Sequence, residues 1–264
     1  MISEGRSWKK FSGKEMFQKF LHSFMTQKWE NLLFLHWPVS KESLESTIPK
    51  SLEIDLFEGE AWLSVVGFRL SELQIKPFVQ IPWRDFSELN LRTYVRDQAG
   101  RRGVWFFSLD SSDLLAVVGA RLLYGLNYRY ASIDYNQKND FIEYASETKL
   151  KRGGIKGSIS SSSPAMKMEG EMAKAGTLNY FLLERYRFWS KQTYRGKLSS
   201  AQVRHRPYDA VCLEQADYQG ELFSCQGFAE PNEDPHLIHY CKGFQVEASA
   251  PYWAFGIAGQ ANHR

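Results

Sequence analysis

The chain has 264 residues, and 33 Lys and Arg side chains nearly balance 30 Asp and Glu, which gives a formal charge of +3. Both signs are dispersed along the sequence, so the polybasic stripe that nucleic acid or an anionic membrane requires is missing, and we expect neither partner. The opening MISEGRSWKK precedes no apolar run of signal-peptide length, and no window resembles a membrane span. We therefore expect a soluble, cytoplasmic protein.

The cysteines and histidines give no sign of a disulfide framework or a metal site. Cys212, Cys225 and Cys241 lie 13 and 16 residues apart, which fits neither paired disulfides nor a zinc site built on CxxC pairs. His236 and His239 lie three apart in a predicted strand, so their side chains would point to opposite faces. Nucleotide-binding, zincin and hydrolase motifs are absent from the sequence. We expect no metal and no cofactor.

The first fifth of the chain predicts two helices around a strand. Residues 14–25, KEMFQKFLHSFM, carry apolar side chains at helical spacing, so we expect an amphipathic helix in an N-terminal extension of residues 1–27. A strand follows at 31–39, NLLFLHWPV, and then a short helix over residues 40–48 that Ser40 would cap.

The next segments predict paired strands. Residues 52–70 read as two strands about a turn at Glu58 and Gly59. A loop over 74–84 separates this hairpin from a strand over 86–97, FSELNLRTYVRD. The turn DQAGRRG then returns the chain into VWFFSLD at 104–110, which we expect to pair antiparallel with the preceding strand.

A helix is predicted directly after this strand pair. The sequence SDLLAVVGARLLYG is apolar almost all round except at Arg121, with Ser111 as the expected N-cap and Gly125 as the end. A helix that is apolar on every side is normally a buried one. We therefore expect a buried helix after a central strand.

The remainder of the chain is rich in strands, with a short helix predicted within TLNYFLLERYRFW. A last strand, HLIHYCKGFQVEASA, closes a single domain of residues 28–250, and residues 251–264 form a C-terminal tail. Many strands joined by turns, few helices and no βα alternation predict a mainly β fold. We expect a closed or nearly closed antiparallel β-barrel.

The strand over 86–97 carries the most informative pattern. Apolar and polar residues alternate, and the polar half consists of Glu88, Asn90, Arg92, Tyr94 and Arg96. Facing water, these would be the solvated residues of an ordinary strand, with Glu88 and Arg92 as a weak ion pair. Facing the inside of a closed sheet, they would form the wall of a binding site.

Long, ordered motifs in the sequence resemble a known family. They are HWPVSKESLESTIPKSLEIDLFEGEAWLSVVGFRL, FSELNLRTYVRDQAGRRGVWFFSLDSSDLLAVVGARLLYGLNYRYA, and the later FLLERYRFW, VRHRPY and HYCKGFQVE. Over about residues 28–248 the chain resembles the YqjF-like proteins, domain of unknown function family 2071, within the acetoacetate decarboxylase-like superfamily. The resemblance implies a cone-like antiparallel barrel with a central cavity, so that the polar half of 86–97 would line a site.

The resemblance also implies a departure from the superfamily's chemistry. Acetoacetate decarboxylases use a lysine that forms an imine with a β-keto acid, assisted by a glutamate on a facing strand. In GARLLYGLNYRYA, Tyr128 stands where the imine-forming lysine would be and Arg129 where its neighbouring lysine would be. Tyrosine cannot form an imine, and arginine stays protonated. The glutamate position is kept, because FSEL places Glu88 there.

Our first hypothesis is therefore a small-molecule-binding protein, or an enzyme acting on a small organic acid or keto compound without a Schiff base. Glu88 is the candidate acid or base, and Tyr128 would donate a hydrogen bond. The expected ligand-binding residues, on one cavity wall, are Asn90, Arg92, Arg121 and Arg129. The sequence leaves turnover and the oligomeric state open.

The alternative is a non-catalytic structural or protein-interaction domain. In that case the barrel would be plugged by its own aromatic side chains, such as Trp62, Trp105 and Phe107. Such a barrel would gain no stability from a ligand and would tolerate Glu88→Gln.

Overall fold

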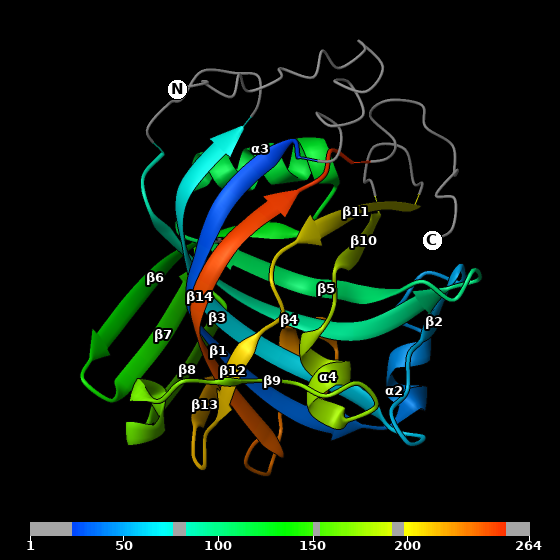
Figure 1. Ribbon diagram of the computed structural model, residues 1–264. Coiled ribbons are helices and arrows are strands. Elements are labelled where there is room, and N and C mark those ends of the chain that lie inside the picture. Colours follow the sequence, from blue (N-terminus) through cyan, green and yellow to red (C-terminus); the bar gives the residue numbers. More distant parts are fainter. Residues whose placement is uncertain (1–22, 76–82, 150–153, 192–197, 252–264) are drawn as a thin grey trace, which may run out of the picture.

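The computed structural model describes residues 23–75, 83–149, 154–191 and 198–251. Seven of its strands pair in a closed ring (Figure 1). In order around the ring they are β1 (Met25–Val39), β3 (Ala61–Ile75), β4 (Phe86–Asp97), β5 (Arg102–Ser111), β10 (Arg187–Lys191), β11 (Leu198–Arg204) and β14 (Leu237–Ala248). The expected mainly β fold with a closed sheet is confirmed.

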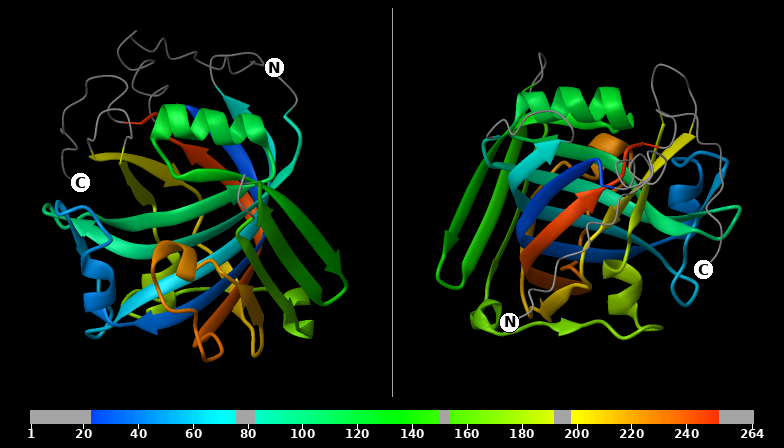
Figure 2. Two further views of the ribbon diagram at one scale, coloured as in Figure 1. Left: turned by 180° about the vertical axis from the view of Figure 1, so that it is seen from behind. Right: turned by 45° about the horizontal axis from the view of Figure 1, so that its top comes forward.

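The sheet is mixed rather than wholly antiparallel. β5 pairs in parallel with β10, and also with β6 (Tyr128–Lys138), through which the sheet continues outside the ring. This extension leans away to one side and consists of β6, β7 (Phe141–Thr148), β8 (Lys156–Ser162) and β13 (Asp217–Gly220) (Figure 2). Short strands β2 (Leu52–Ile54), β9 (Glu171–Met172) and β12 (Asp209–Cys212) complete the sheet.

Strand β4 is covered on both of its faces, since every residue from Phe86 to Val95 is buried. Leu89 and Leu91 point outward and belong to a core shared with Tyr144 and Ile159 of the extension. By the two-residue period of a strand, the alternating residues Glu88, Asn90 and Arg92 point into the ring. The strand is therefore apolar toward the outer core and polar toward the inside.

The helix α3 (Leu114–Tyr124) lies across one end of the ring (Figure 2). Its N-cap is Asp113, whose carboxylate accepts from the Ala116 N–H at 2.7 Å, whereas the expected cap, Ser111, is the last residue of β5. The helix ends as expected at Gly125, whose φ of 65° suits glycine.

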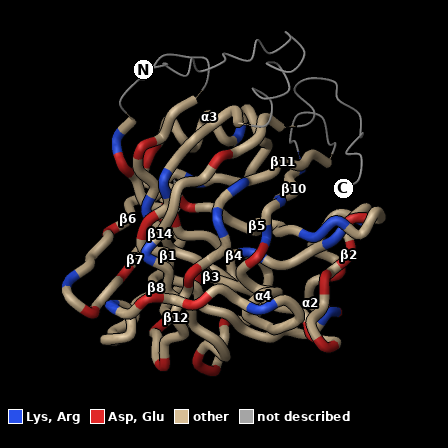
Figure 3. Tube along the Cα trace, viewed as in Figure 1, with Lys and Arg blue, Asp and Glu red and all other residues tan. Residues whose placement is uncertain are grey.

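The expectation that α3 is buried is wrong. Leu115 and Leu122 are 67% and 70% exposed, and Leu114 and Val118 are exposed as well. The helix covers the ring with one side only, so its remaining apolar side chains face outward. Figure 3 shows how little charge this helix carries, while Lys and Arg alternate with Asp and Glu elsewhere along the described chain.

The other helices are short. They are α2 (Lys41–Glu45), α4 (Leu178–Leu183) and the 3-10 turns Pro164–Lys167 and Ser224–Gln226. Ser40 caps α2 as expected, since its hydroxyl accepts from the Ser43 N–H at 3.3 Å. None of the described helices is both long and apolar enough to traverse a bilayer.

Three other expectations need correction or fall outside the described residues. The turn at Glu58 and Gly59 is present and is closed by a single antiparallel bridge between Phe57 and Glu60, but β2 pairs with β4 and not with β3, so the pairing does not extend beyond this bridge. The predicted helix over 14–25 lies outside the described residues except at its end, where Met25 begins β1. The tail of residues 251–264 lies outside them after residue 251.

Candidate functional site

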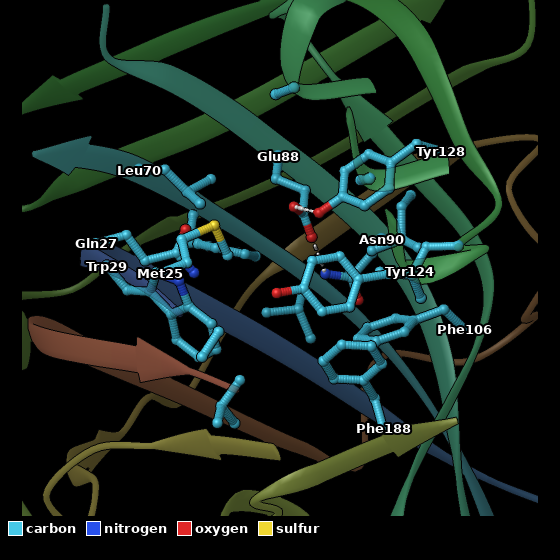
Figure 4. Close-up of a pocket in the computed structure, with 18 of the residues that line it drawn as sticks. Met25, Gln27, Trp29, Leu70, Glu88, Asn90, Phe106, Tyr124, Tyr128 and Phe188 are labelled. Carbon is cyan, nitrogen blue, oxygen red and sulfur yellow. Dashed lines mark hydrogen bonds between the residues drawn. The ribbon is translucent and has the colours of Figure 1, made fainter. Parts of the chain in front are cut away.

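A cavity of about 160 Å³ lies inside the ring beneath α3 (Figure 4). Strands β1, β3, β4, β5, β10 and β11 contribute to its walls, and α3 contributes to its roof. Most of the lining is apolar, and Phe106 and Phe188 form part of one wall. The polar exceptions include Glu88, Asn90 and Arg92, three alternate residues of the single strand β4.

Glu88 is the buried acid of this cavity, with 2% of its surface exposed. The Tyr128 hydroxyl donates to its Oε2 at 2.6 Å, and the Asn90 amide donates to its Oε1 at 3.1 Å. Burial raises the pKa of Glu88 from 4.5 to about 7, even though both hydrogen bonds and Arg92 lower it. Near neutral pH this carboxyl can therefore both donate and accept a proton.

Tyr128 comes from the first residue of β6, where that strand meets the end of β5. Burial and then the neighbouring Glu88 raise the pKa of Tyr128 well above its usual range. The phenol therefore stays protonated and is a hydrogen-bond donor to a carboxylate or carbonyl oxygen.

Arg92 brings a buried positive charge to the same wall. Only 8% of it is exposed, and its Nε and Nη2 are buried without a hydrogen-bond partner in the described structure. The guanidinium lies 5.4 Å from the ring centre of Phe34 and 5.8 Å from that of Tyr94. By contrast, Arg185, which also lines the cavity, pairs with Asp55 at 2.6 Å.

Behind Arg92 lies a polar network that holds no compensating negative charge. His36 contacts Ser64 Oγ through Nδ1 at 2.7 Å and His239 through Nε2 at 3.1 Å, and Ser64 contacts the Tyr94 hydroxyl at 2.7 Å. Burial, His239 and Arg92 hold the pKa of His36 well below its usual range. Both imidazoles are neutral at pH 7, because burial lowers the pKa of His239 to about 4.

This network is the part of the site that sequence reasoning missed. A histidine in a buried strand ordinarily bonds to a backbone carbonyl, whereas the partners of His36 are side chains of β3 and β14. His36 and Ser64 are direct neighbours in the β1–β3 register. Only knowledge of that register could have brought them together.

The two remaining arginines expected on the cavity wall do not line it. Arg129 points away from Tyr128 and pairs with the buried Asp110 at 2.6 Å, close to Cys225. Arg121 is exposed on α3, and its Nε donates to the backbone carbonyl of Tyr128 at 2.6 Å. Of the charged residues expected on the cavity wall, Glu88 and Arg92 line it, whereas Arg121 and Arg129 do not. Asn90 lies between Glu88 and Arg92 on β4, and Tyr128 reaches Glu88 from β6.

Of the three aromatic side chains that the sequence suggested as filling the barrel, one lies inside the ring. Trp105 and Phe107 face the outer core. Trp62 does pack inside the ring, with Tyr94 and Phe181, at the end opposite α3. One end of the ring is thus filled by side chains, and the cavity occupies the end beneath α3.

The histidines considered as metal ligands have other contacts. His236 packs against Trp62 with ring centres 5.4 Å apart, and His205 stacks on Phe244 at 4.6 Å. Within the described ranges, no three His, Cys, Asp or Glu side chains are grouped as a metal ion would need.

Comparison with known proteins places this geometry in context. A family model described as "Uncharacterized conserved protein", domain of unknown function family 2071, matches residues 26–245. The chain is 37% identical over 220 residues to "Uncharacterized protein YqjF" of Bacillus subtilis (strain 168), covering 83% of this chain and 87% of that protein.

The similar solved structures have the acetoacetate decarboxylase fold. An acetoacetate decarboxylase from Legionella pneumophila superposes with a TM-score of 0.59 at 11% identity, over 86% of this chain and 88% of that one. The enduracididine biosynthesis enzyme MppR, complexed with pyruvate, gives a TM-score of 0.55 at 10% identity, over 86% and 88%. At these identities the likeness concerns the fold.

Proposed function

This chain belongs to domain of unknown function family 2071, and we propose that its cavity binds a small organic acid or keto compound. The proposal rests above all on Arg92, a buried guanidinium that lines the cavity and has two nitrogens without a hydrogen-bond partner in the described structure. A buried charge without a partner is costly, and a bound carboxylate would remove that cost while accepting two parallel hydrogen bonds. The fold neighbour MppR, which is complexed with pyruvate, is consistent with a keto acid as ligand.

The same geometry supports a role in proton transfer. A carbonyl group of the bound compound would lie near Tyr128, which donates a hydrogen bond, and near Glu88, whose pKa of about 7 suits it to give or take a proton. Because Tyr128 stands at the lysine position of the superfamily, we propose chemistry without an imine. Among the described residues that line the cavity there is no lysine.

The test compares two arginine variants. Isothermal titration of the wild-type protein with pyruvate and acetoacetate should show binding that Arg92→Met abolishes. Arg204→Met is the matched control, since it removes the same charge from an exposed position on β11. Equal binding by Arg92→Met and wild type would contradict the proposal. A separate assay, product analysis with Glu88→Gln, would distinguish an enzyme from a binding protein.

The alternative of a non-catalytic interaction domain is favoured by one observation, the outward apolar face of α3 with Leu114 and Leu122. A protein of that kind would bind none of the acids and would keep its stability unchanged in their presence. The titration above therefore separates the two functions.

A further inference from the structure

The cavity has a polar part and an apolar part, and they are arranged along β4. Phe86, Glu88, Asn90 and Arg92 follow one another from the α3 end inward. On the neighbouring strand, Ser64 faces Arg92 while Phe68 and Leu70 face Glu88 and Phe86. The polar groups thus lie deep in the ring, and the lining becomes apolar toward α3, apart from Gln27.

The side of α3 that lines the cavity carries small side chains. Ala116, Gly119 and Ala120 lie on the side of α3 that lines the cavity, at the spacing of one helical face. A Cβ added at Gly119 would meet no atom within 4 Å. Small side chains at these positions leave room between the helix and the apolar walls below it.

From this arrangement we infer that the ligand is a carboxylic or keto acid with an apolar tail. The inference rests on the proposed function, in which the carboxylate binds Arg92 at the deep end of the lining. Arg92 and Phe86 lie at opposite ends of the part of β4 that lines the cavity. A two-carbon acid bound at Arg92 would leave the apolar part of the cavity empty, whereas an acid with a longer chain would extend into it.

The size of the cavity agrees with a tail of moderate length. Its volume of about 160 Å³ is close to the ~150 Å³ of an apolar cavity that holds benzene. A head group near Glu88 and Arg92 with an alkyl or aromatic tail directed at Gly119 would occupy this space. The tail would replace solvent against Leu70 and Phe86, which line the cavity.

The experiment is a chain-length series. Acetate, butanoate, hexanoate and octanoate are titrated into the wild-type protein by calorimetry, and the weak members are measured by displacement of octanoate. Affinity should rise by about four-fold for each methylene buried. In Gly119→Leu the larger side chain occupies the tail space, so octanoate should bind no better than butanoate, while acetate binds as in the wild type.

Two further variants complete the design. Leu122→Gln changes the outward side of the same helix and should leave the whole series unchanged. Ala120→Leu repeats the obstruction at a second roof position, in case Gly119→Leu alters folding, which a thermal unfolding curve of each variant would reveal.

The outcomes separate this inference from the proposed function. If affinity does not depend on chain length but is lost in Arg92→Met, the tail is refuted and the acid site stands. If the chain-length gain is present but Arg92→Met binds octanoate as tightly as the wild type, the apolar space stands and the carboxylate site is refuted. If no acid binds to the wild-type protein, both are overturned.

Discussion

Replacing Glu88 by glutamine should change the pH dependence of stability in a defined direction. The pKa of this carboxyl is raised by burial from 4.5 to about 7 in the folded protein. Between these two values the folded state holds a proton on Glu88 that the unfolded state has lost, so the contribution of Glu88 to stability falls as pH rises. A difference of about 2.5 pKa units corresponds to about 3 kcal/mol. Glutamine resembles the protonated acid at every pH and removes this loss.

Urea unfolding of wild type and Glu88→Gln between pH 4 and pH 8 measures the effect. The free energy of unfolding of the variant minus that of the wild type should increase by about 3 kcal/mol across this range, mostly between pH 4.5 and pH 7. Glu60→Gln, at an exposed position, serves as the control. A difference between variant and wild type that stays constant with pH would show that Glu88 ionises normally, and the proton-transfer role would lose its basis.

Three other variants test the surroundings of the site by the same unfolding measurement. Burial lowers the pKa of His239 to about 4, so the contribution of this histidine to the free energy of unfolding should fall by about 3 kcal/mol as pH falls from 6.5 to 4. The free energy of unfolding of His239→Asn minus that of the wild type should rise by this amount over the same range, and a constant difference would contradict a buried neutral His239. Arg92→Met should raise the free energy of unfolding by about 1–3 kcal/mol, whereas Arg185→Met should lower it by about 3 kcal/mol. The reason is that the buried Asp55 would lose its partner at 2.6 Å and keep the more exposed Arg102 at 3.4 Å. Equal effects of the two variants would show that Arg92 has a partner after all. Gly67→Ala should lower the free energy of unfolding by about 1–3 kcal/mol, since the new Cβ would lie 2.6 Å from Cδ2 of Tyr144. An unchanged free energy of unfolding would mean that β7 can move away from the ring.

The sequence predicted correctly which strands form the site. It predicted less well whether single side chains point into the ring or away from it. The alternation in β4 indicates which residues share a face, but only closure of the ring decides that Glu88 and Arg92 point inward. The grouping of Arg129 with Tyr128 could have been rejected earlier, because adjacent residues of a strand point to opposite faces. Arg129 accordingly pairs with Asp110 outside the cavity.

The helix α3 shows a different limit of sequence reasoning. A helix that is apolar all round has no preferred face, so its sequence contains no signal for how Arg121 or Gly119 is oriented. Its position over the open end of the ring exposes one side, and burial cannot be deduced from composition alone. Closure of the ring through the parallel β5–β10 pair likewise depends on contacts between residues distant in sequence, such as Trp105 and Trp189.

The neutral phenol of Tyr128 beside Glu88 has an electrostatic consequence for the whole site. An ammonium group beside Glu88 would hold that carboxyl ionised, whereas a neutral phenol leaves burial as the dominant influence on its pKa. Arg92 is the cation that still lowers the pKa of Glu88. A carboxylate bound to Arg92 would cancel this effect and make Glu88 hold its proton more tightly. The bound acid would therefore place a proton donor beside its own carbonyl group, which is the arrangement that general acid catalysis requires.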